Sequence, residues 1–222
     1  MKIGVFDSGM GGTTVMHAIK DLLKNEEYFY IADSKNCPYG EKSDEDLMKI
    51  VTKNVETLKN WGAKIIVIAC NTATVKCIQK LRKNYPEIKF VGTEPAIKLA
   101  TKTGAKNVLV LATPGTVKSE RAHQLIAENL KKDQTITLLP CPGLADTIEN
   151  KGNVTKKLTE LLKNVDQTPD VIVLGCTHYS LIKPEIKSFF KSAKIIDGNS
   201  GVAHRVATIA NSIQDKTIFS SQ

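Results

Sequence analysis

The sequence predicts an α/β fold of two pseudo-symmetric domains with mainly parallel sheets and an active site in the cleft between them. Apolar strand segments alternate with helical patterns along the chain, an order typical of parallel sheets. Segments such as residues 65–68 (IIVI) are apolar throughout, which indicates burial on both faces of a sheet. The chain also repeats its own pattern, since Cys176 falls 106 residues after Cys70 in a matching context.

Eight segments are rich in apolar and β-branched residues and are bounded by turn residues. Because these are the features of buried strands, we expect a strand in each. They are residues 2–6, 27–32, 64–69, 89–93, 107–112, 135–139, 170–175 and 194–197.

Helical periodicity fills the intervals between these strands. Residues 14–24 place apolar side chains at the spacing of one helix face. Residues 44–60 follow Ser43, a favourable N-cap residue, and carry three acidic residues in the first turn. Further helices are expected at residues 72–84, 95–103, 117–131, 154–165, 184–191 and 200–213.

The internal repeat relates two copies of one α/β unit. Residues 3–9 (IGVFDSG) correspond to residues 109–115 (LVLATPG), and residues 65–73 (IIVIACNTA) to residues 171–179 (VIVLGCTHY). The repeat predicts a first domain and a second domain of similar fold. We expect the first to comprise residues 1–93 plus 200–222 and the second residues 94–199.

Composition narrows the classes of partner. The net charge is +8, but most of the cations are lysines scattered along the chain without interleaved aromatic residues. We therefore expect no nucleic-acid partner. No apolar stretch approaches the roughly 20 residues that span a bilayer, and no secretory signal is visible, so we expect a cytoplasmic protein without a membrane partner.

Most of the cysteines and histidines have ordinary structural interpretations. The five cysteines include no CxxC pair, so we expect free thiols and no metal site. We expect Cys77 to pack in the core, and Cys37 and Cys141, each before a proline, to be structural. The three histidines outside the second cysteine motif are expected at surface or packing positions: His17, His123 and His204.

Cys70 and Cys176 differ because each ends a strand at a corresponding place in the repeat. Ligands of open α/β sheets bind outside the carboxyl ends of the strands. If the two domains face each other, the two thiols face each other across one cleft. One thiolate can then remove a carbon-bound proton while the other thiol returns a proton on the opposite face, which inverts a stereocentre.

Neighbouring polar residues fit this chemistry. Amides at the predicted strand-to-helix turns favour anions, and with Asn71, Thr72 and Thr177 we expect them to hold a substrate carboxylate. His178 follows Cys176 by two residues and is expected to assist its proton transfers. Asp7, at the end of the first strand, is expected to assist Cys70.

Six motifs carry a family resemblance, and together they cover nearly the whole chain. They are FDSGMGG (6–12), CPYG (37–40), ACNTAT (69–74), ATPGTVKS (112–119), CPGLADTIENKG (141–152) and LGCTHYS (174–180). In this order they resemble the glutamate racemases, of the cofactor-independent aspartate/glutamate racemase superfamily. The DSGMGG segment by itself could also cradle a phosphate, but it lacks the Lys-Ser/Thr ending of a P-loop.

The resemblance implies an isomerase that interconverts L- and D-glutamate and supplies D-glutamate for peptidoglycan and cell shape. It implies no pyridoxal phosphate, no other cofactor and no metal, and a homodimer. By position, Cys70 would deprotonate D-glutamate and Cys176 L-glutamate, assisted by Asp7 and His178. The residues implied to bind substrate are Ser8, Pro38, Tyr39, Gly40, Asn71, Thr72, Thr113, Thr116, Glu149 and Thr177.

Two alternatives stay open at this stage. The same thiol pair would serve a racemase of aspartate or another acidic amino acid. A non-catalytic binding protein would keep the fold without turnover. The chain departs from the family pattern at Thr13, where Leu is usual, and at Ser180, where Pro is usual, which leaves side-chain specificity open.

Overall fold

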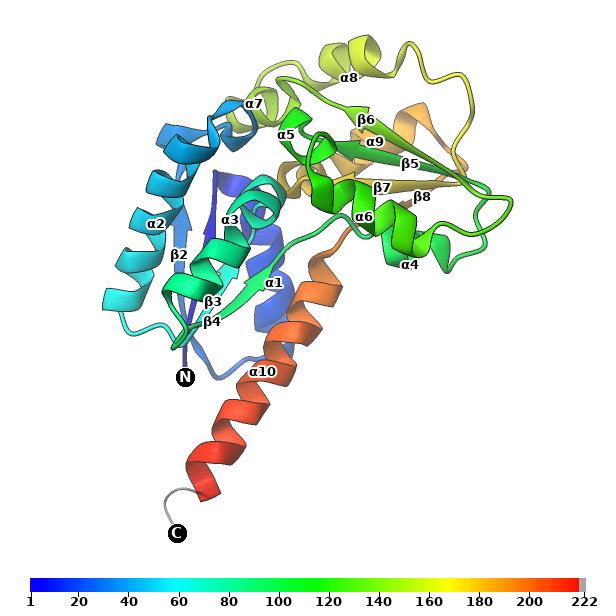
Figure 1. The fold of residues 1–222 in the computed structure, drawn as a ribbon. Helices are drawn as coiled ribbons and strands as arrows, with labels where there is room; N and C mark the ends of the chain where they lie inside the picture. The colour runs from blue at the N-terminus through cyan, green and yellow to red at the C-terminus, as the bar shows by residue number, and fades with distance from the viewer. Residues whose placement is uncertain (220–222) are drawn as a thin grey trace.

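Two four-stranded sheets, each with all strands parallel, form the framework of the chain (Figure 1). The computed structural model describes residues 1–219, with side chains described through residue 214. Residues 220–222, part of the predicted first domain, lie outside the described residues. The eight predicted strands are confirmed, each within one residue of its predicted bounds.

The first sheet has the strand order β2-β1-β3-β4, and helices cover both of its faces. Its strands are β1 (Lys2–Asp7), β2 (Glu27–Ala32), β3 (Ile65–Ile68) and β4 (Lys89–Gly92). Its helices are α1 (Thr13–Leu22), α2 (Asp44–Asn60), α3 (Asn71–Asn84) and α10 (Asn199–Phe219). Three short 3₁₀ helices follow strand ends or loops: η1 (Met10–Gly12), η2 (Ser34–Asn36) and η3 (Tyr39–Glu41).

The second sheet has the equivalent order β6-β5-β7-β8. Its strands are β5 (Asn107–Ala112), β6 (Thr135–Pro140), β7 (Val171–Gly175) and β8 (Lys194–Ile196). Its helices are α4 (Ile97–Thr101), α5 (Pro114–Val117), α6 (Glu120–Asn129), α7 (Leu144–Glu149), α8 (Val154–Leu162), α9 (Lys183–Phe189) and the 3₁₀ helix η4 (Thr177–Ile182). The sequence repeat is therefore a repeat of topology.

Strand alternation divides the first half into two apolar layers. Ile66 and Ile68 on β3 pack with α2 and α3, whereas Ile65 and Val67 pack with α1 and α10. Successive side chains of a strand point to opposite faces, so a run of four apolar residues fills both layers. The second half repeats the arrangement around β7.

The chain crosses from the first sheet to the second after β4 and returns before α10, which packs along α1 (Figure 1). Val206 and Ala210 on α10 are fully buried against the first sheet. The two crossings leave the carboxyl ends of β1, β3, β5 and β7 turned toward the contact between the halves. Among the described residues, no helix combines the length and apolar character needed to cross a membrane.

Two helix predictions need correction. The helix predicted at residues 117–131 begins only at Glu120, as α6, because Ser119 caps it by accepting a hydrogen bond from the Ala122 amide at 3.2 Å. The short α5 that precedes it was not predicted. Helix α7 was not predicted from the sequence. It begins directly after Gly143, a residue with a left-handed backbone conformation (φ 71°). With six residues, α7 is too short to show a periodic pattern.

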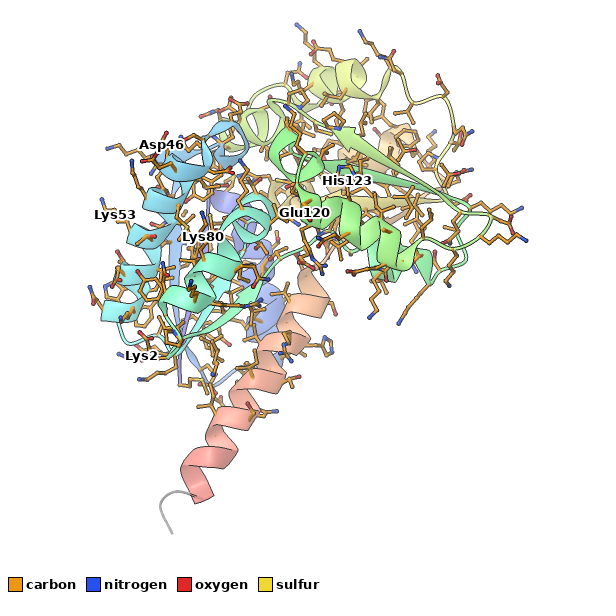
Figure 2. All side chains as sticks on the ribbon, viewed as in Figure 1. Lys2, Asp46, Lys53, Lys80, Glu120 and His123 are labelled. Carbon is orange, nitrogen blue, oxygen red and sulfur yellow. The ribbon has the colours of Figure 1, made fainter. Side chains whose placement is uncertain are left out.

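Charged side chains are dispersed over the surface. Figure 2 shows Asp46 and Lys53 on α2 and Lys80 on α3, all exposed. His123 is exposed on α6 (Figure 2). His17 and His204 are also exposed, which confirms the prediction that these histidines lie outside the core.

Ile66→Ala should reduce the free energy of unfolding by about 2–5 kcal/mol, because Ile66 is fully buried on a central strand and the change leaves a cavity. Leu130→Ala is the matched control, since Leu130 is 47% exposed; its effect should stay within about 0.5 kcal/mol. Urea unfolding of both variants measures the difference. Equal losses would contradict the assignment of β3 to the core.

Candidate active site

Cys70 and Cys176 occupy equivalent places at the carboxyl edges of the two sheets. Cys70 follows β3 and is the N-cap residue of α3, and Cys176 follows β7 and is the N-cap residue of η4. Backbone amides of Thr72 and Ala73 face the Cys70 sulfur, and the amide of His178 faces the Cys176 sulfur. These amides are the anion-favouring donors of a helix start.

The two thiols share one buried site. Cys70 is 6% exposed and Cys176 is 8% exposed. Burial raises the pKa of both thiols above the ordinary range of cysteine, and the nearby Asp7 carboxylate adds to the effect at each. Charge on Cys70, in the other half, also raises the pKa of Cys176.

His178 lies between Cys176 and a carboxylate. Its Nδ1 is 3.9 Å from Cys176 Sγ, and its Nε2 is 2.7 Å from Glu149 Oε2. His178 is almost completely buried, with 1% of its side chain exposed. This cysteine–histidine–carboxylate order is the arrangement in which a histidine exchanges a proton with a thiol while the carboxylate orients the ring.

Glu149 joins the two halves. Its Oε2 also accepts a hydrogen bond from the Met10 amide at 2.9 Å, and its Oε1 accepts one from the Ser34 hydroxyl. Burial raises the pKa of Glu149, but the hydrogen bonds from Ser34, Met10 and His178 outweigh it, so the pKa lies below its usual range. Glu149 is therefore a carboxylate at neutral pH.

Asp7 is fully buried at the end of β1. Its Oδ2 accepts hydrogen bonds from the Gly12 amide at 2.6 Å and from the Thr177 hydroxyl of the second half at 3.0 Å. Its Oδ1 has no hydrogen-bond partner in the described part of the chain. Burial raises the pKa of Asp7, against the opposing effect of His178 and of these donors. The Cys70 thiol donates a hydrogen bond to Ser8 Oγ at 3.9 Å.

Three threonines bring their hydroxyls together across the two halves. Thr72 Oγ1 lies 2.8 Å from Thr113 Oγ1 and 3.5 Å from Thr116 Oγ1, and Thr113 donates to Thr116 at 3.1 Å. Next to Thr72, Asn71 is 3% exposed and its Nδ2 has no partner among the described residues. The site thus holds several buried donors suited to oxygen anions.

The CPYG segment lies beside this cluster, but the tyrosine hydroxyl points elsewhere. Tyr39 donates to Asp33 Oδ2 at 2.6 Å and accepts from Asn54 Nδ2 at 3.0 Å, and its side chain is 1% exposed. Gly40 lies against Thr113, since a Cβ at Gly40 would sit 3.4 Å from Thr113 Oγ1. The preceding residue, Pro38, is half-buried and follows a cis peptide bond.

The glycines of the DSGMGG loop permit the close contact between the halves. A Cβ at Gly9 would lie 2.3 Å from Glu149 Oε2, and one at Gly11 would lie 2.5 Å from the His178 backbone nitrogen. Tyr30 on β2 holds the loop in place, because its hydroxyl donates a hydrogen bond to the Gly9 carbonyl at 2.7 Å. Only a chain without side chains at these positions can pack here.

Ser34, Asp33, Asn54 and Tyr30 were not found by sequence reasoning. Two of them, Asp33 and Ser34, directly follow β2, so the same strand-end rule that identified the cysteines would have found them. Asn54 and Tyr30 give no such signal, because one lies within a helix and the other within a strand.

The remaining cysteines divide between core and site. Cys77 is 1% exposed in the core beside α2, which confirms its prediction as a packing residue. Cys141 is also buried. Cys37 is half-buried beside Ser8, and burial raises its pKa to about 12. In the described residues, no cluster of three or more His, Cys, Asp and Glu side chains is placed to hold a metal ion.

Comparison with known proteins defines the class. The pattern of the family described as Asp/Glu/Hydantoin racemase matches residues 3–206. A glutamate racemase of Sulfurovum sp. is 38% identical over 220 residues, covering 95% of this chain and 83% of the relative. A glutamate racemase of Clostridium acetobutylicum is 41% identical over 205 residues, covering 90% and 80% of the two chains.

Solved structures agree. The Escherichia coli glutamate racemase in complex with L-glutamate and the activator UDP-MurNAc-ala has a TM-score of 0.85 and 32% identity, covering 93% of this chain and 80% of that chain. The Francisella tularensis glutamate racemase in complex with D-glutamate has a TM-score of 0.81 and 27% identity, covering 96% and 82%. The predicted fold class is confirmed.

The fold, the placement of the two thiols and the relatives together define the protein as an isomerase, more specifically an amino-acid racemase. The chain belongs to the Asp/Glu/Hydantoin racemase family, and the resemblance to glutamate racemases found in its motifs is confirmed.

Gly11→Ala should abolish most racemase activity, because the new Cβ would lie 2.5 Å from the His178 backbone and push the two halves apart. Gly201→Ala is the control, since a Cβ there meets nothing within 4 Å; it should keep activity and change stability by at most about 1 kcal/mol. Activity and thermal melting of both variants are the measurements. Full activity in Gly11→Ala would contradict a tight contact here.

Proposed function

We propose that the chain interconverts L- and D-glutamate by proton transfer between two bases, Cys70 and Cys176. The observation that supports this most is the delivery of two buried thiols to one site by equivalent strands of the two sheets. Inversion at a carbon needs a base and an acid on opposite faces, and two facing thiols supply both. The relatives named as glutamate racemases and the neighbours bound to L- and D-glutamate support the choice of substrate.

The proton balance is symmetrical. The Cys176 thiolate removes the Cα proton of L-glutamate and becomes a thiol, leaving a carbanion at Cα. The Cys70 thiol then protonates the opposite face and becomes a thiolate, which gives D-glutamate. The reverse direction begins with Cys70 as thiolate and Cys176 as thiol. Because the thiols supply both base and acid, the reaction in this form requires no pyridoxal phosphate and no metal.

The two thiols have different means of ionisation. His178 Nδ1, 3.9 Å from Cys176 Sγ, is placed to accept the thiol proton, and Glu149 would stabilise the resulting imidazolium. The Cys70 sulfur instead faces the Ser8 hydroxyl and the amides that begin α3. Amides at a helix start stabilise a thiolate.

The unpartnered polar atoms match an amino acid with two carboxylates. Within the described residues, Asp7 Oδ1 is a buried acceptor without a partner, which suits an ammonium group. Asn71 Nδ2 is likewise a buried donor without a partner in that part of the chain, which suits a carboxylate oxygen. Hydroxyls of Thr72, Thr113 and Thr116 would serve the second carboxylate. Buried polar groups left unmatched are destabilising, so substrate binding would satisfy atoms that the free protein leaves open.

The same resemblance supports the wider proposals. D-Glutamate made by this reaction would serve peptidoglycan synthesis. The enzyme would act in the cytoplasm and would be a homodimer. The crossings after β4 and before α10 support a division into residues 94–199 and residues 1–93 with the C-terminal helix.

The direct experiment follows the circular dichroism of L-glutamate with the purified, reduced protein and without added cofactor or metal. Decay of the signal to zero is the expected result. A flat signal with glutamate but decay with L-aspartate would change the assigned substrate. A flat signal with both would favour a binding protein.

Cys70→Ala and Cys176→Ala should each reduce racemisation by about 10²- to 10⁴-fold, the usual contribution of a positioned acid or base. Cys77→Ala is the matched control, because Cys77 is equally buried but lies in the core. It should remain active. Steady-state kinetics in both directions measure the effect, and normal turnover by Cys70→Ala would rule out the two-thiol reaction.

The rate should rise with pH. Burial holds the pKa of both active thiols above the ordinary range, so the reactive thiolate is the minor form at neutral pH and increases as pH rises. We expect kcat/KM to climb between about pH 6 and about pH 9. A pH profile of initial rates measures this, and a constant kcat/KM over that range would contradict raised thiol pKa values.

A further inference from the structure

A hydroxyl of the first half holds the carboxylate that orients His178. Ser34 begins η2, directly after β2, whereas Glu149 ends α7 in the second half. The Ser34 Oγ donates a hydrogen bond to Glu149 Oε1. Neither the motifs nor the family resemblance assigned any part to Ser34.

The two oxygens of Glu149 have separate partners. Oε1 accepts from Ser34, while Oε2 accepts from the Met10 amide at 2.9 Å and faces His178 Nε2 at 2.7 Å. A carboxylate held at one oxygen has little freedom to rotate, so the Ser34 hydrogen bond fixes where Oε2 meets the ring. The Glu149 side chain is 11% exposed, whereas Ser34 lies at an exposed position beside it.

The position of Glu149 decides which ring nitrogen of His178 carries the proton. A carboxylate beside Nε2 accepts the N–H there, and Nδ1 is then the nitrogen with a free lone pair. Nδ1 is the nitrogen that faces Cys176 Sγ at 3.9 Å. Loss of this orientation would turn a donor toward the thiol or move the ring away from it.

We propose that Ser34 is a positioning residue for the Cys176 half of the reaction, acting through Glu149 and His178. The inference rests on the proposed glutamate racemisation. Ser34 should affect the Cys176 step alone, because the side-chain hydrogen-bond partner of the Cys70 sulfur is Ser8 and not His178. Removal of the Ser34 hydroxyl should therefore slow proton transfer at Cys176 more than at Cys70.

Rates alone would not reveal the one-sided effect. L- and D-glutamate have equal free energies, so kcat/KM must fall by the same factor in both directions. Isotope effects separate the two steps, because deuterium at Cα of L-glutamate is transferred to Cys176 and deuterium at Cα of D-glutamate is transferred to Cys70. If the Cys176 step slows, proton removal from L-glutamate by Cys176 becomes rate-limiting. Proton removal from D-glutamate by Cys70 then comes close to equilibrium before the slow step.

The experiment compares Ser34→Ala with the wild type, using L- and D-glutamate that carry deuterium at Cα. We expect kcat/KM to fall about tenfold, the usual effect of one hydrogen bond to a charged group. The isotope effect on kcat/KM should rise with L-glutamate and should not rise with D-glutamate. Ser34→Thr, which keeps a hydroxyl, should restore both values.

Ser188→Ala is the control, because Ser188 is an exposed serine on α9, outside the cysteine motifs, whose hydroxyl donates to the Glu185 carbonyl. It should match the wild type. Isotope effects that change equally for both enantiomers, or an unchanged kcat/KM in Ser34→Ala, would overturn the role of Ser34 while leaving the proposed function intact. Absence of turnover by the wild type would instead overturn the proposed function itself, and this role with it.

Discussion

Parallel pairing in two sheets of the same strand order is the constraint on which the site depends. In each sheet the third strand in chain order, β3 or β7, pairs with the first and fourth. Its carboxyl end therefore opens at the sheet edge where polar side chains can gather. Since both sheets turn that edge toward their mutual contact, Cys70 and Cys176 reach one site from opposite sides. A single sheet would present only one of them.

Polar contacts between the two halves make their packing arrangement specific. Asp7 accepts from Thr177, Thr72 meets Thr113, and Glu149 accepts from the first half. These atoms are buried, and a buried polar group that loses its partner destabilises by about 1–3 kcal/mol. The halves therefore fit in one arrangement, which is also the one that encloses the thiols. The same burial raises the pKa of those thiols. In the proposed reaction, the neighbouring histidine and amides would offset this effect by accepting the thiol proton or stabilising the thiolate.

Much of the fold could be predicted from the sequence because its signals are local. The apolar run at residues 65–68 identifies a buried strand, and its counterpart at residues 171–174 identifies the repeat. The start of α6 at Glu120 was missed because the helical composition of residues 117–131 begins before it, and the capping hydrogen bond of Ser119 outweighs that composition. The placement of Cys70 and Cys176 at strand ends followed directly from the positions of those strands.

The sequence by itself determined the strands, the repeat and the two thiols, since each depends on residues near one another in the chain. Only the tertiary structure decided what surrounds the thiols. Ser34 and Glu149 are far apart in the sequence, and no periodicity connects them. The tyrosine of the CPYG segment turns its hydroxyl to Asp33 rather than to the cleft. Such contacts depend on how two sheets pack, and packing depends on shape and on buried hydrogen bonds that the order of residues does not display.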